Sequence, residues 1–381
     1  MITRNLASLL LRSRKSSLLL GPRQTGKSTL IRSLKPDLTI NLADESVYLA
    51  FASNPREIYE RLHVQSYRTV FIDEIQRLPS LLNTLQAILD EGQFTGRCYL
   101  TGSSARKLRR GHANLLPGRI HTYNLGPLVA SELAYRLDAK RALSLGTLPG
   151  IWTATDRSEA EKTLRSYAAT YLKEEIQAEA LTRNVEGFSR FLLVVASEAG
   201  KFLDLSKLSA QASLPRQSAV RYLEILEDTL ILRRCEAFRT SLRRQLLHSP
   251  RWFFFDTGVL NGLLGNFVVS ADRIGMLFEH LVFNQLVDSA QSNDRTIRVS
   301  SYRTPHGAEV DFVVEMDNRL LAIEVKASAS VGRPDLRGFQ SFAEYVGKQH
   351  QRFLVYLGTA KRIIEGVRVL PWQDFLREMG L

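Results

Sequence analysis

Cysteine is scarce in this sequence: Cys98 and Cys235 are the only two among 381 residues. They stand far apart, and the seven histidines are scattered without the spacing of metal ligands. The sequence therefore predicts neither a disulfide scaffold nor a structural zinc site. Two reduced, buried thiols are typical of a cytoplasmic protein, and we expect that location.

Long apolar runs are also missing. No stretch approaches the roughly 20 apolar residues that a membrane-spanning helix needs. Residues 1–6 show no apolar signal core followed by a cleavage site, so we expect neither a leader nor a membrane partner. There is no repeat of solenoid period, no low-complexity segment, no dinucleotide fingerprint and no recognisable Ser–His–Asp arrangement.

Acidic residues are outnumbered: 51 Lys and Arg against 39 Asp and Glu give a net charge of +12. That excess favours polyanionic partners such as DNA, although a basic surface without a specific ligand has the same composition. The length predicts two or three domains, and a hydrophobic content of 44% is enough to fill their cores.

A glycine-bounded loop lies between an apolar stretch at residues 17–20, typical of a buried strand, and a helix start at residues 29–34. This context predicts a phosphate-binding loop, in which backbone N–H groups and the helix N-terminus face a phosphate. Lys27 would reach the β- and γ-phosphates of ATP, and the Ser28 hydroxyl would bind Mg²⁺. The residues predicted to bind the nucleotide here are Gly21, Pro22, Arg23, Gln24, Thr25, Gly26, Lys27, Ser28 and Thr29.

Two later strands end in polar residues that complete this prediction. Residues 69–72 form an apolar run followed by Asp73 and Glu74. Asp73 would hold Mg²⁺ and Glu74 would polarise the attacking water, which favours hydrolysis over simple nucleotide binding. Residues 98–101 form another buried strand. If it lies between the other two, Ser103 or Ser104 would sense the γ-phosphate, although a helix cap explains either serine equally well.

These motifs together resemble a family of prokaryotic AAA-type ATPases that carry a C-terminal restriction-endonuclease-like domain of unknown function. The resemblance rests on Gly-Pro-Arg-Gln-Thr-Gly-Lys-Ser at 21–28, Phe-Ile-Asp-Glu at 71–74, Leu-Thr-Gly-Ser-Ser at 100–104 and Leu-Pro-Gly-Arg at 116–119. It implies that Arg119 contacts the triphosphate. A structural salt bridge is an equally good explanation of Arg119.

The middle of the chain has the outline of a winged helix-turn-helix. Helical patterns begin near residues 191, 205 and 215, and a strand follows at 230–234. Pro215 would start the third helix and leave Arg216, Gln217 and Arg221 facing outward, where a recognition helix contacts DNA. A protein-contact module has the same outline, so both interpretations stay open.

The last third of the chain resembles the PD-(D/E)xK nuclease fold. Asp311 lies on one predicted strand, and Glu324 and Lys326 lie two residues apart on the next, so both face one side. Asp311 and Glu324 would bind Mg²⁺, Lys326 would orient or deprotonate water, and Glu279 on the preceding helix would add a carboxylate. The chain has Val310 where the motif has proline. An ordinary exposed hairpin alternates charged and apolar residues in the same way.

The predicted fold is α/β throughout, with four segments: an AAA-type P-loop domain at 1–140, a helical linker at 141–188, a winged helix-turn-helix at 189–250 and a nuclease-like domain at 251–381. The favoured hypothesis is a Mg²⁺-dependent ATP hydrolase that binds and cleaves DNA under ATP control. A second hypothesis is a nucleotide-switched scaffold whose nuclease-like domain only binds a partner. A third is a homo-oligomeric ring motor in which Arg119 acts on a neighbour's nucleotide.

Overall fold

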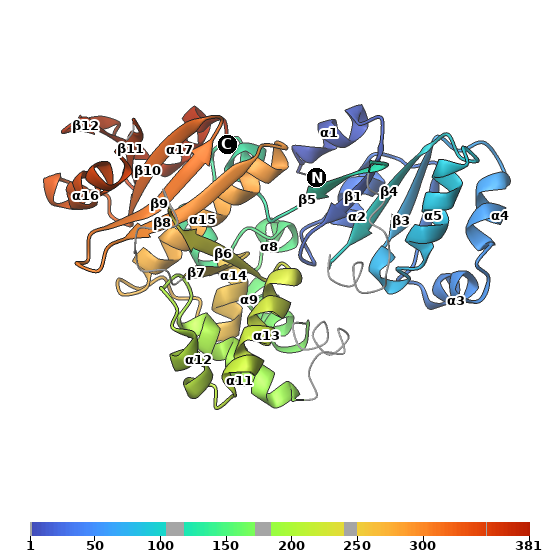
Figure 1. Cartoon of the computed structure of the whole chain (residues 1–381), viewed down its shortest axis with the longest axis horizontal. Helices are drawn as coiled ribbons and strands as arrows, with labels where there is room; N and C mark the ends of the chain where they lie inside the picture. Colours follow the sequence, from blue (N-terminus) through green and yellow to red (C-terminus); the bar gives the residue numbers. More distant parts are fainter. Residues whose placement is uncertain (1, 104–117, 172–183, 240–249, 348) are drawn as a thin grey trace. The chain divides into compact units, whose positions relative to one another are not determined.

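Figure 1 shows the protein as a computed structural model, which describes residues 2–103, 118–171, 184–239, 250–347 and 349–381. The chain divides into two compact units. The first contains Met1–Gly126, Asp228–Leu230 and Gln291–Asp294; the second contains Pro127–Glu227, Ile231–Ala290 and Arg295–Leu381. Ser104 and the Leu-Pro pair of the 116–119 motif lie outside the described residues.

A five-stranded sheet in the order β2-β3-β4-β1-β5 forms the centre of the first unit. Every neighbouring pair is parallel. The strands are β1 (Ser16–Leu20), β2 (Leu38–Asn41), β3 (Thr69–Asp73), β4 (Arg97–Gly102) and β5 (Ile120–Asn124). The helices are α1 (Leu6–Arg12), α2 (Lys27–Ser33), α3 (Glu45–Ser53), α4 (Glu57–His63) and α5 (Leu81–Asp90), with a 3₁₀ turn, η1 (Ile75–Arg77).

Alternation along the strands sends side chains to the two faces of this sheet. Leu18, Ile72 and Leu100 pack with residues of α3, α4 and α5 in one apolar cluster. Leu19 and Phe71 pack with residues of α1 and α2 in another. The unit is therefore a three-layer α/β/α structure, and the carboxyl ends of its parallel strands meet at one edge.

The second unit is built on an eight-stranded sheet in the order β12-β13-β11-β10-β9-β8-β6-β7. Strands β8, β9 and β10 are antiparallel neighbours, whereas β10 pairs with β11, and β11 with β13, in parallel. The strands are β6 (Leu232–Ala237), β7 (Arg251–Phe254), β8 (Ile297–Arg303), β9 (Glu309–Met316), β10 (Arg319–Lys326), β11 (Gln351–Tyr356), β12 (Arg362–Ile364) and β13 (Val367–Pro371).

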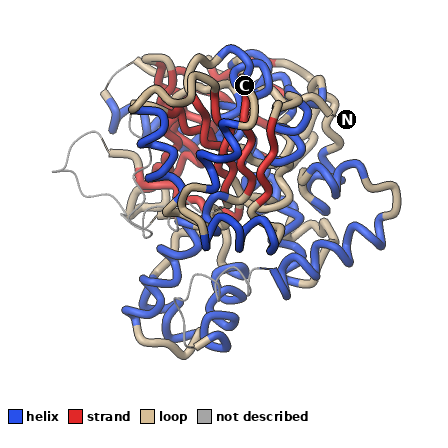
Figure 2. The backbone as a smooth tube through the Cα atoms, turned by 90° about the vertical axis from the view of Figure 1, so that its right-hand side faces the viewer, coloured by secondary structure: helices blue, strands red, loops and turns tan. Residues whose placement is uncertain are grey.

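The helices of this unit cover both faces of the sheet and extend into an all-helical part around α11, α12 and α13, visible in Figures 1 and 2. They are α7 (Ala139–Leu145), α8 (Pro149–Thr153), α9 (Arg157–Ser166), α11 (Val185–Ser197), α12 (Leu205–Gln211), α13 (Arg216–Asp228), α14 (Thr257–Leu264), α15 (Ile274–Ser292), α16 (Arg337–Val346) and α17 (Trp372–Met379). Short turns are η2 (Ala130–Leu133), η3 (Tyr167–Tyr171) and η4 (Arg333–Leu336).

One large apolar cluster joins these helices to the sheet. It runs from Ala130 to Leu381 in the sequence and contains buried residues of α11, α13, α15 and β9. Strand β6, predicted as part of a winged helix, pairs with β7 and β8. The limit predicted at residue 250 therefore falls between two strands that pair with each other, and the four-segment division stays a prediction.

Among the described residues, none of the helices combines the length and the apolar character that crossing a bilayer requires.

Candidate functional site

The glycine-bounded loop joins the end of β1 to the start of α2, as predicted. A Cβ atom on Gly21 would lie 2.2 Å from the carbonyl oxygen of Leu125, so only glycine fits there. Gly26 has a φ of 89°, in the left-handed region. The Lys27 ammonium donates to the carbonyls of Gly21 and Pro22, both at 2.9 Å. The loop thus curls around the lysine nitrogen.

Arg4 holds this loop from outside the motif. Its guanidinium donates to the carbonyls of Thr25, at 2.7 Å, and Gly126, at 2.8 Å, and its side chain is only 7% exposed. Thr25 adds a hydrogen bond from its hydroxyl to the Pro22 carbonyl. The loop is thereby fixed to the start of the chain as well as to the sheet.

Asp73 lies at the end of β3, and two hydroxyl groups donate to its Oδ1. Ser28 Oγ is 2.7 Å away and Thr101 Oγ1 is 2.5 Å away. The Arg32 guanidinium of α2 lies 3.5 Å from Oδ2. These groups meet because β4 lies between β3 and β1, so the carboxyl ends of all three strands are adjacent.

Glu74 follows Asp73 with a left-handed φ of 59°. Its backbone N–H donates to Thr101 Oγ1 at 3.2 Å. The side-chain amide of Gln76 donates both to the Glu74 carboxylate and, at 3.1 Å, to the hydroxyl of Ser103. Gln76 is 6% exposed, and its Oε1 has no hydrogen-bond partner among the described residues. One amide therefore links the predicted water-polarising carboxylate to the predicted γ-phosphate sensor.

Three other predicted nucleotide contacts lie in the loop and the first turn of α2, where Gln24 and Thr29 are exposed and Arg23 is half-buried. Arg119 is different. Arg119 precedes β5, whose first residue, Ile120, pairs with Ser16 at the opposite end of β1 from the loop. The guanidinium of Arg119 instead forms a 2.6 Å ion pair with Asp90. The structure does not bring Arg119 to the loop of its own chain, and contact with a neighbour's nucleotide stays a prediction.

The second candidate site lies on α15, β9 and β10. Asp311 Oδ2 accepts a 2.8 Å hydrogen bond from the Val325 N–H, and Lys326 Nζ lies 2.6 Å from Glu324 Oε1. Glu324 and Lys326 therefore share one side of β10, as their spacing predicts. Within the described part of the chain, no group of three or more His, Cys, Asp or Glu side chains is arranged to hold a metal ion.

Arg251, at the start of β7, is the reason that Glu279 is already engaged. Its guanidinium pairs with the Glu279 carboxylate, donates to the Gly200 carbonyl at 2.5 Å and is 4% exposed. The rings of Phe202, Phe253 and Phe312 surround it. Nothing in the sequence pattern distinguishes Arg251 from the other arginines of the chain.

Burial changes the acidity of these carboxylates. Desolvation, then the nearby charge of Asp311, raises the pKa of Glu324 to about 8. The same two causes raise the pKa of Glu279 to about 7, against the opposing effect of Arg251. Both carboxyl groups therefore keep a proton to a higher pH than exposed glutamates do.

The third helix of the predicted helix-turn-helix, α13, is anchored by aromatic packing. The Tyr222 ring meets the rings of Phe188 and Phe191 of α11 edge-on, at centroid distances of 5.0 and 5.7 Å. Opposite this buried face, Arg216, Gln217 and Arg221 are exposed. The outward orientation predicted for these three residues is confirmed.

Comparison with known proteins matches three stretches of the chain to family models. Residues 13–134 match the family model described as an AAA domain. Residues 136–269 and 274–375 match two domains of unknown function, DUF8612 and DUF4143. The strand–loop–helix motif, with Asp73 and Thr101 at neighbouring strand ends, agrees with the first match. The first unit contains a P-loop ATPase domain of the AAA type.

Uncharacterized proteins of Mycobacterium bovis and Mycobacterium tuberculosis are each 26% identical over 320 residues, which is 82% of this chain and 70% of theirs. The solved structures that align with this chain include the replication initiator DnaA bound to AMPPCP and single-stranded DNA, an Hsp104–ADP complex of Saccharomyces cerevisiae, and a protein of Vibrio cholerae.

These structural matches are distant. Identity is 10% for DnaA, 18% for Hsp104 and 13% for the Vibrio protein, with TM-scores of 0.28, 0.28 and 0.23. The alignments cover 60%, 59% and 96% of this chain and 90%, 38% and 97% of the other chains, respectively. Scores this low carry no argument about the fold of the AAA-type domain or of the second unit.

Sequence reasoning missed several residues of the AAA-type domain. Thr101 lies inside the Leu-Thr-Gly-Ser-Ser motif, and Gln76 lies two residues after Glu74. Their places in the sequence could therefore have marked them as site residues. Arg4 offers no such signal, because its contacts depend on how α1 packs.

Proposed function

We propose that the chain is a Mg²⁺-dependent ATPase that binds and cleaves DNA under ATP control. The observation that carries the ATPase part is the meeting of Ser28, Asp73 and Thr101 at adjacent strand ends, with Glu74 next to them. A hydroxyl and a carboxylate are hard oxygen ligands, and they lie within hydrogen-bond distance, so the pair fits Mg²⁺.

Each residue then has a defined task. Lys27 and the loop amides bind the phosphates of ATP, while Ser28 and Asp73 would hold Mg²⁺, which neutralises phosphate charge when bound. Glu74 orients and polarises the attacking water. Gln76 holds the Glu74 carboxylate in place, and Ser103 lies at the other end of the same amide.

ATPase assays on single variants test these tasks. We expect Lys27→Ala to lose nucleotide binding, and Glu74→Gln to keep binding but hydrolyse ATP at least 100-fold more slowly. The matched control is Glu91→Gln, an exposed carboxylate at the end of α5. Full hydrolysis by Glu74→Gln would refute the role of Glu74.

DNA contact is supported by the exposed face of α13 and by the net charge of +12. The cleavage part is supported by the order α15, β8, β9, β10, α16, β11, in which β10 pairs antiparallel with β9 and parallel with β11. Asp311, Glu324 and Lys326 lie on the two central strands of that arrangement. Asp311 and Glu324 would hold Mg²⁺, and Lys326 would orient the water.

Cleavage is tested with plasmid and single-stranded DNA in the presence of Mg²⁺, with and without ATP. Loss of products in Asp311→Ala and Lys326→Ala would establish the second site as a nuclease. The response of cleavage to Lys27→Ala would show whether ATP controls it. Absence of products with the wild type, while ATP is still hydrolysed, would refute the nuclease part.

A second candidate function is a nucleotide-controlled switch whose C-terminal part binds a partner without cutting. The ion pair between buried Arg251 and half-buried Glu279 favours this alternative, because it neutralises one of the three carboxylates predicted to bind metal. Complete absence of DNA binding at low salt would decide for the switch.

A further inference from the structure

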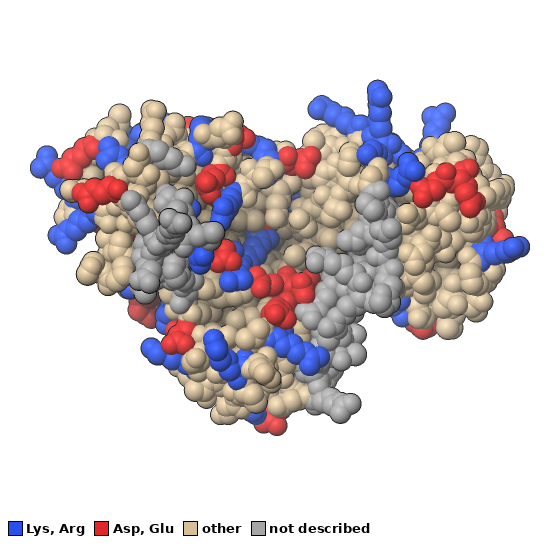
Figure 3. All heavy atoms as spheres, viewed as in Figure 1, with Lys and Arg blue, Asp and Glu red and all other residues tan. Residues whose placement is uncertain are grey.

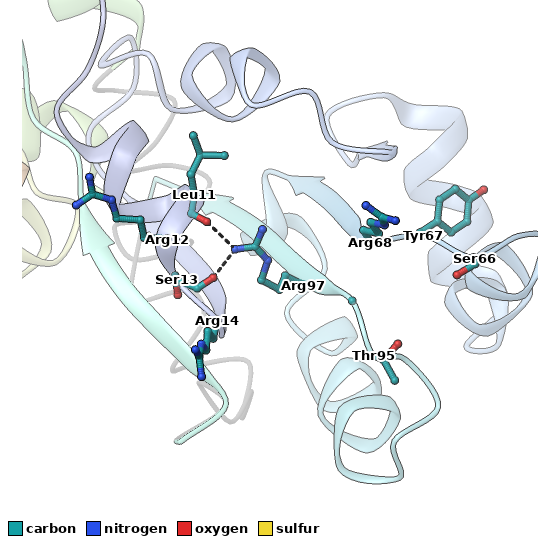
Figure 4. A pocket seen from close by; sticks show the side chains of 10 residues that line it. Leu11, Arg12, Ser13, Arg14, Ser66, Tyr67, Arg68, Thr95 and Arg97 are labelled. Carbon is teal, nitrogen blue, oxygen red and sulfur yellow. Dashed lines mark hydrogen bonds between the residues drawn. The ribbon is translucent and has the colours of Figure 1, made fainter.

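A pocket of about 440 Å³ opens at the edge of the first unit opposite the phosphate-binding loop. Its walls are the turn between α1 and β1, the residues before β3 and the residues before and at the start of β4 (Figure 4). Strands β1, β3 and β4 thus carry the predicted ATP site at their carboxyl ends and this pocket at their amino ends. These strands have five or six residues, so the predicted ATP site and the pocket lie about 17 to 20 Å apart along them.

Four arginines line the pocket: Arg12, Arg14, Arg68 and Arg97. None of the ten lining residues is an aspartate or a glutamate. Among the described residues, neither Arg12 nor Arg14 forms an ion pair, and both are exposed. Lys and Arg side chains also project from the unit near α1 in Figure 3. Such a collection of like charges is most stable when an anion lies among them.

The walls of the pocket are held in place by hydrogen bonds of Arg97 and Asp37. Arg97 donates to the carbonyls of Leu11 and Ser13, which fixes the α1–β1 turn against β4 (Figure 4). On the opposite wall, the Asp37 carboxylate accepts the backbone N–H groups of Arg68 and Thr69, both at 2.8 Å. These hydrogen bonds lower the pKa of Asp37, so it stays ionised and keeps the wall anchored. The pocket is therefore preorganised.

Apolar surface lies beside the charges. Leu11 is 55% exposed at the pocket, whereas Tyr67, beside Arg68, is half-buried and packs against the apolar cluster of the first unit. Positive charge next to exposed apolar surface suits a single strand, which presents its backbone together with unpaired bases. Double-stranded ligands hide their bases and would leave this surface unused.

We propose that this pocket binds the phosphodiester backbone of single-stranded nucleic acid. The inference extends the proposed function, because it places a nucleic-acid contact on the ATPase unit in addition to α13. Under this proposal, ATP binds at the carboxyl ends of β1, β3 and β4, and single-stranded nucleic acid binds at their amino ends.

The test is fluorescence anisotropy of a labelled single-stranded DNA oligonucleotide, titrated with the full chain between 50 and 200 mM salt. Log K falls linearly as log salt rises, and each phosphate contact to a single strand makes the slope steeper by about 0.7. We expect the R12A/R14A/R68A variant to bind at least tenfold more weakly than the wild type. Its slope should be shallower by about 2, because three phosphate contacts are removed. Arg97 is left intact because it holds the wall.

Two further variants serve as comparisons. The R56A/R136A/R362A variant removes three exposed arginines that do not line the pocket, and it should bind as the wild type does. The R216A/R221A variant removes the exposed arginines of α13. If the triple pocket variant does not fold by circular dichroism, R12E/R14E changes only exposed side chains and should lose a similar share of the slope.

Three results would overturn the proposal. The first is an unchanged slope and affinity in the pocket variant; if R216A/R221A is weakened at the same time, the proposed function survives. The second is tighter binding of the matching duplex, with the same dependence on the pocket arginines. The third is displacement of the oligonucleotide by inorganic phosphate at constant ionic strength, which would indicate a site for a small anion. No binding by the wild type at 50 mM salt would instead remove the proposed DNA function together with this inference.

Discussion

Ser28 Oγ donates a 2.7 Å hydrogen bond to Oδ1 of Asp73, which lies 45 positions further along the chain. The hydroxyl comes from the first turn of α2 and the carboxylate from the end of β3. Their contact shows that the two predicted metal ligands are already aligned by the order of strands in the sheet.

Ser28→Ala should lower hydrolysis by about tenfold to 100-fold, because a hydrogen bond to a charged group contributes about 1.5–3 kcal/mol. The rate should be measured over a range of Mg²⁺ concentrations, and we expect half-maximal activity to need more Mg²⁺. Ser33→Ala is the control, since within the described part of the chain that hydroxyl bonds only to the Leu30 carbonyl of its own helix. An unchanged Mg²⁺ dependence in Ser28→Ala would contradict its role as a ligand.

Gln76→Met should lower kcat by about tenfold and leave KM for ATP nearly unchanged, because the amide orients Glu74 rather than binding the nucleotide. Methionine keeps the volume of the buried side chain and removes both hydrogen bonds. Ser103→Ala should lower kcat by a smaller factor. The Gln76→Met/Ser103→Ala double variant should lower kcat by less than the product of the two single factors, because the two side chains share a hydrogen bond. Gln93→Met, at an exposed glutamine, is the control. An increase in KM alone would show that Gln76 acts in binding.

Arg251→Met should lower the free energy of unfolding by about 1.5–3 kcal/mol, because it leaves the half-buried Glu279 carboxylate without its partner. Glu279→Leu in the Arg251→Met background should recover part of that loss. Urea unfolding of the two single variants and the double variant gives the coupling energy. Additive losses would mean that the pair contributes nothing beyond its separate side chains.

Asp256 should make stability fall as the pH rises from about 4 to 6. Burial raises the pKa of this N-cap carboxyl from 3.8 to about 6, although the N–H groups of Thr147 and Val259 lower it. In that range the folded chain keeps a proton that the unfolded chain has released, so the loss reaches about 3 kcal/mol and then levels off.

Asp256→Asn has no such proton, so the difference in unfolding free energy between the wild type and this variant should change with pH over the same range. Asp204→Asn alters an exposed N-cap of α12 and should differ from the wild type by a constant amount. Parallel curves for the wild type and Asp256→Asn would contradict the raised pKa.

The P-loop motif and the strand ends were predictable because they depend on local sequence. Glycines at 21 and 26, a strand before them and carboxylates after residue 72 each carry their own signal. The partners of these groups were harder to predict. Arg4, Arg32 and Arg251 act through packing between segments far apart in the chain, and an arginine in a helix or strand looks the same whether it is paired or free. Whether β6 forms a wing or joins a sheet likewise depends on β8, which begins 60 residues later.

Strand β6 follows α13 after a short turn and is hydrogen-bonded between β7 and β8. Helix α13 is therefore tied, through a short connection, to the sheet that holds Asp311 and Lys326. A nucleic acid held by α13 and cut at those residues would be severed at a constant number of nucleotides from the point of contact. Under the proposed function, the lengths of the fragments would then report the distance between α13 and the second candidate site.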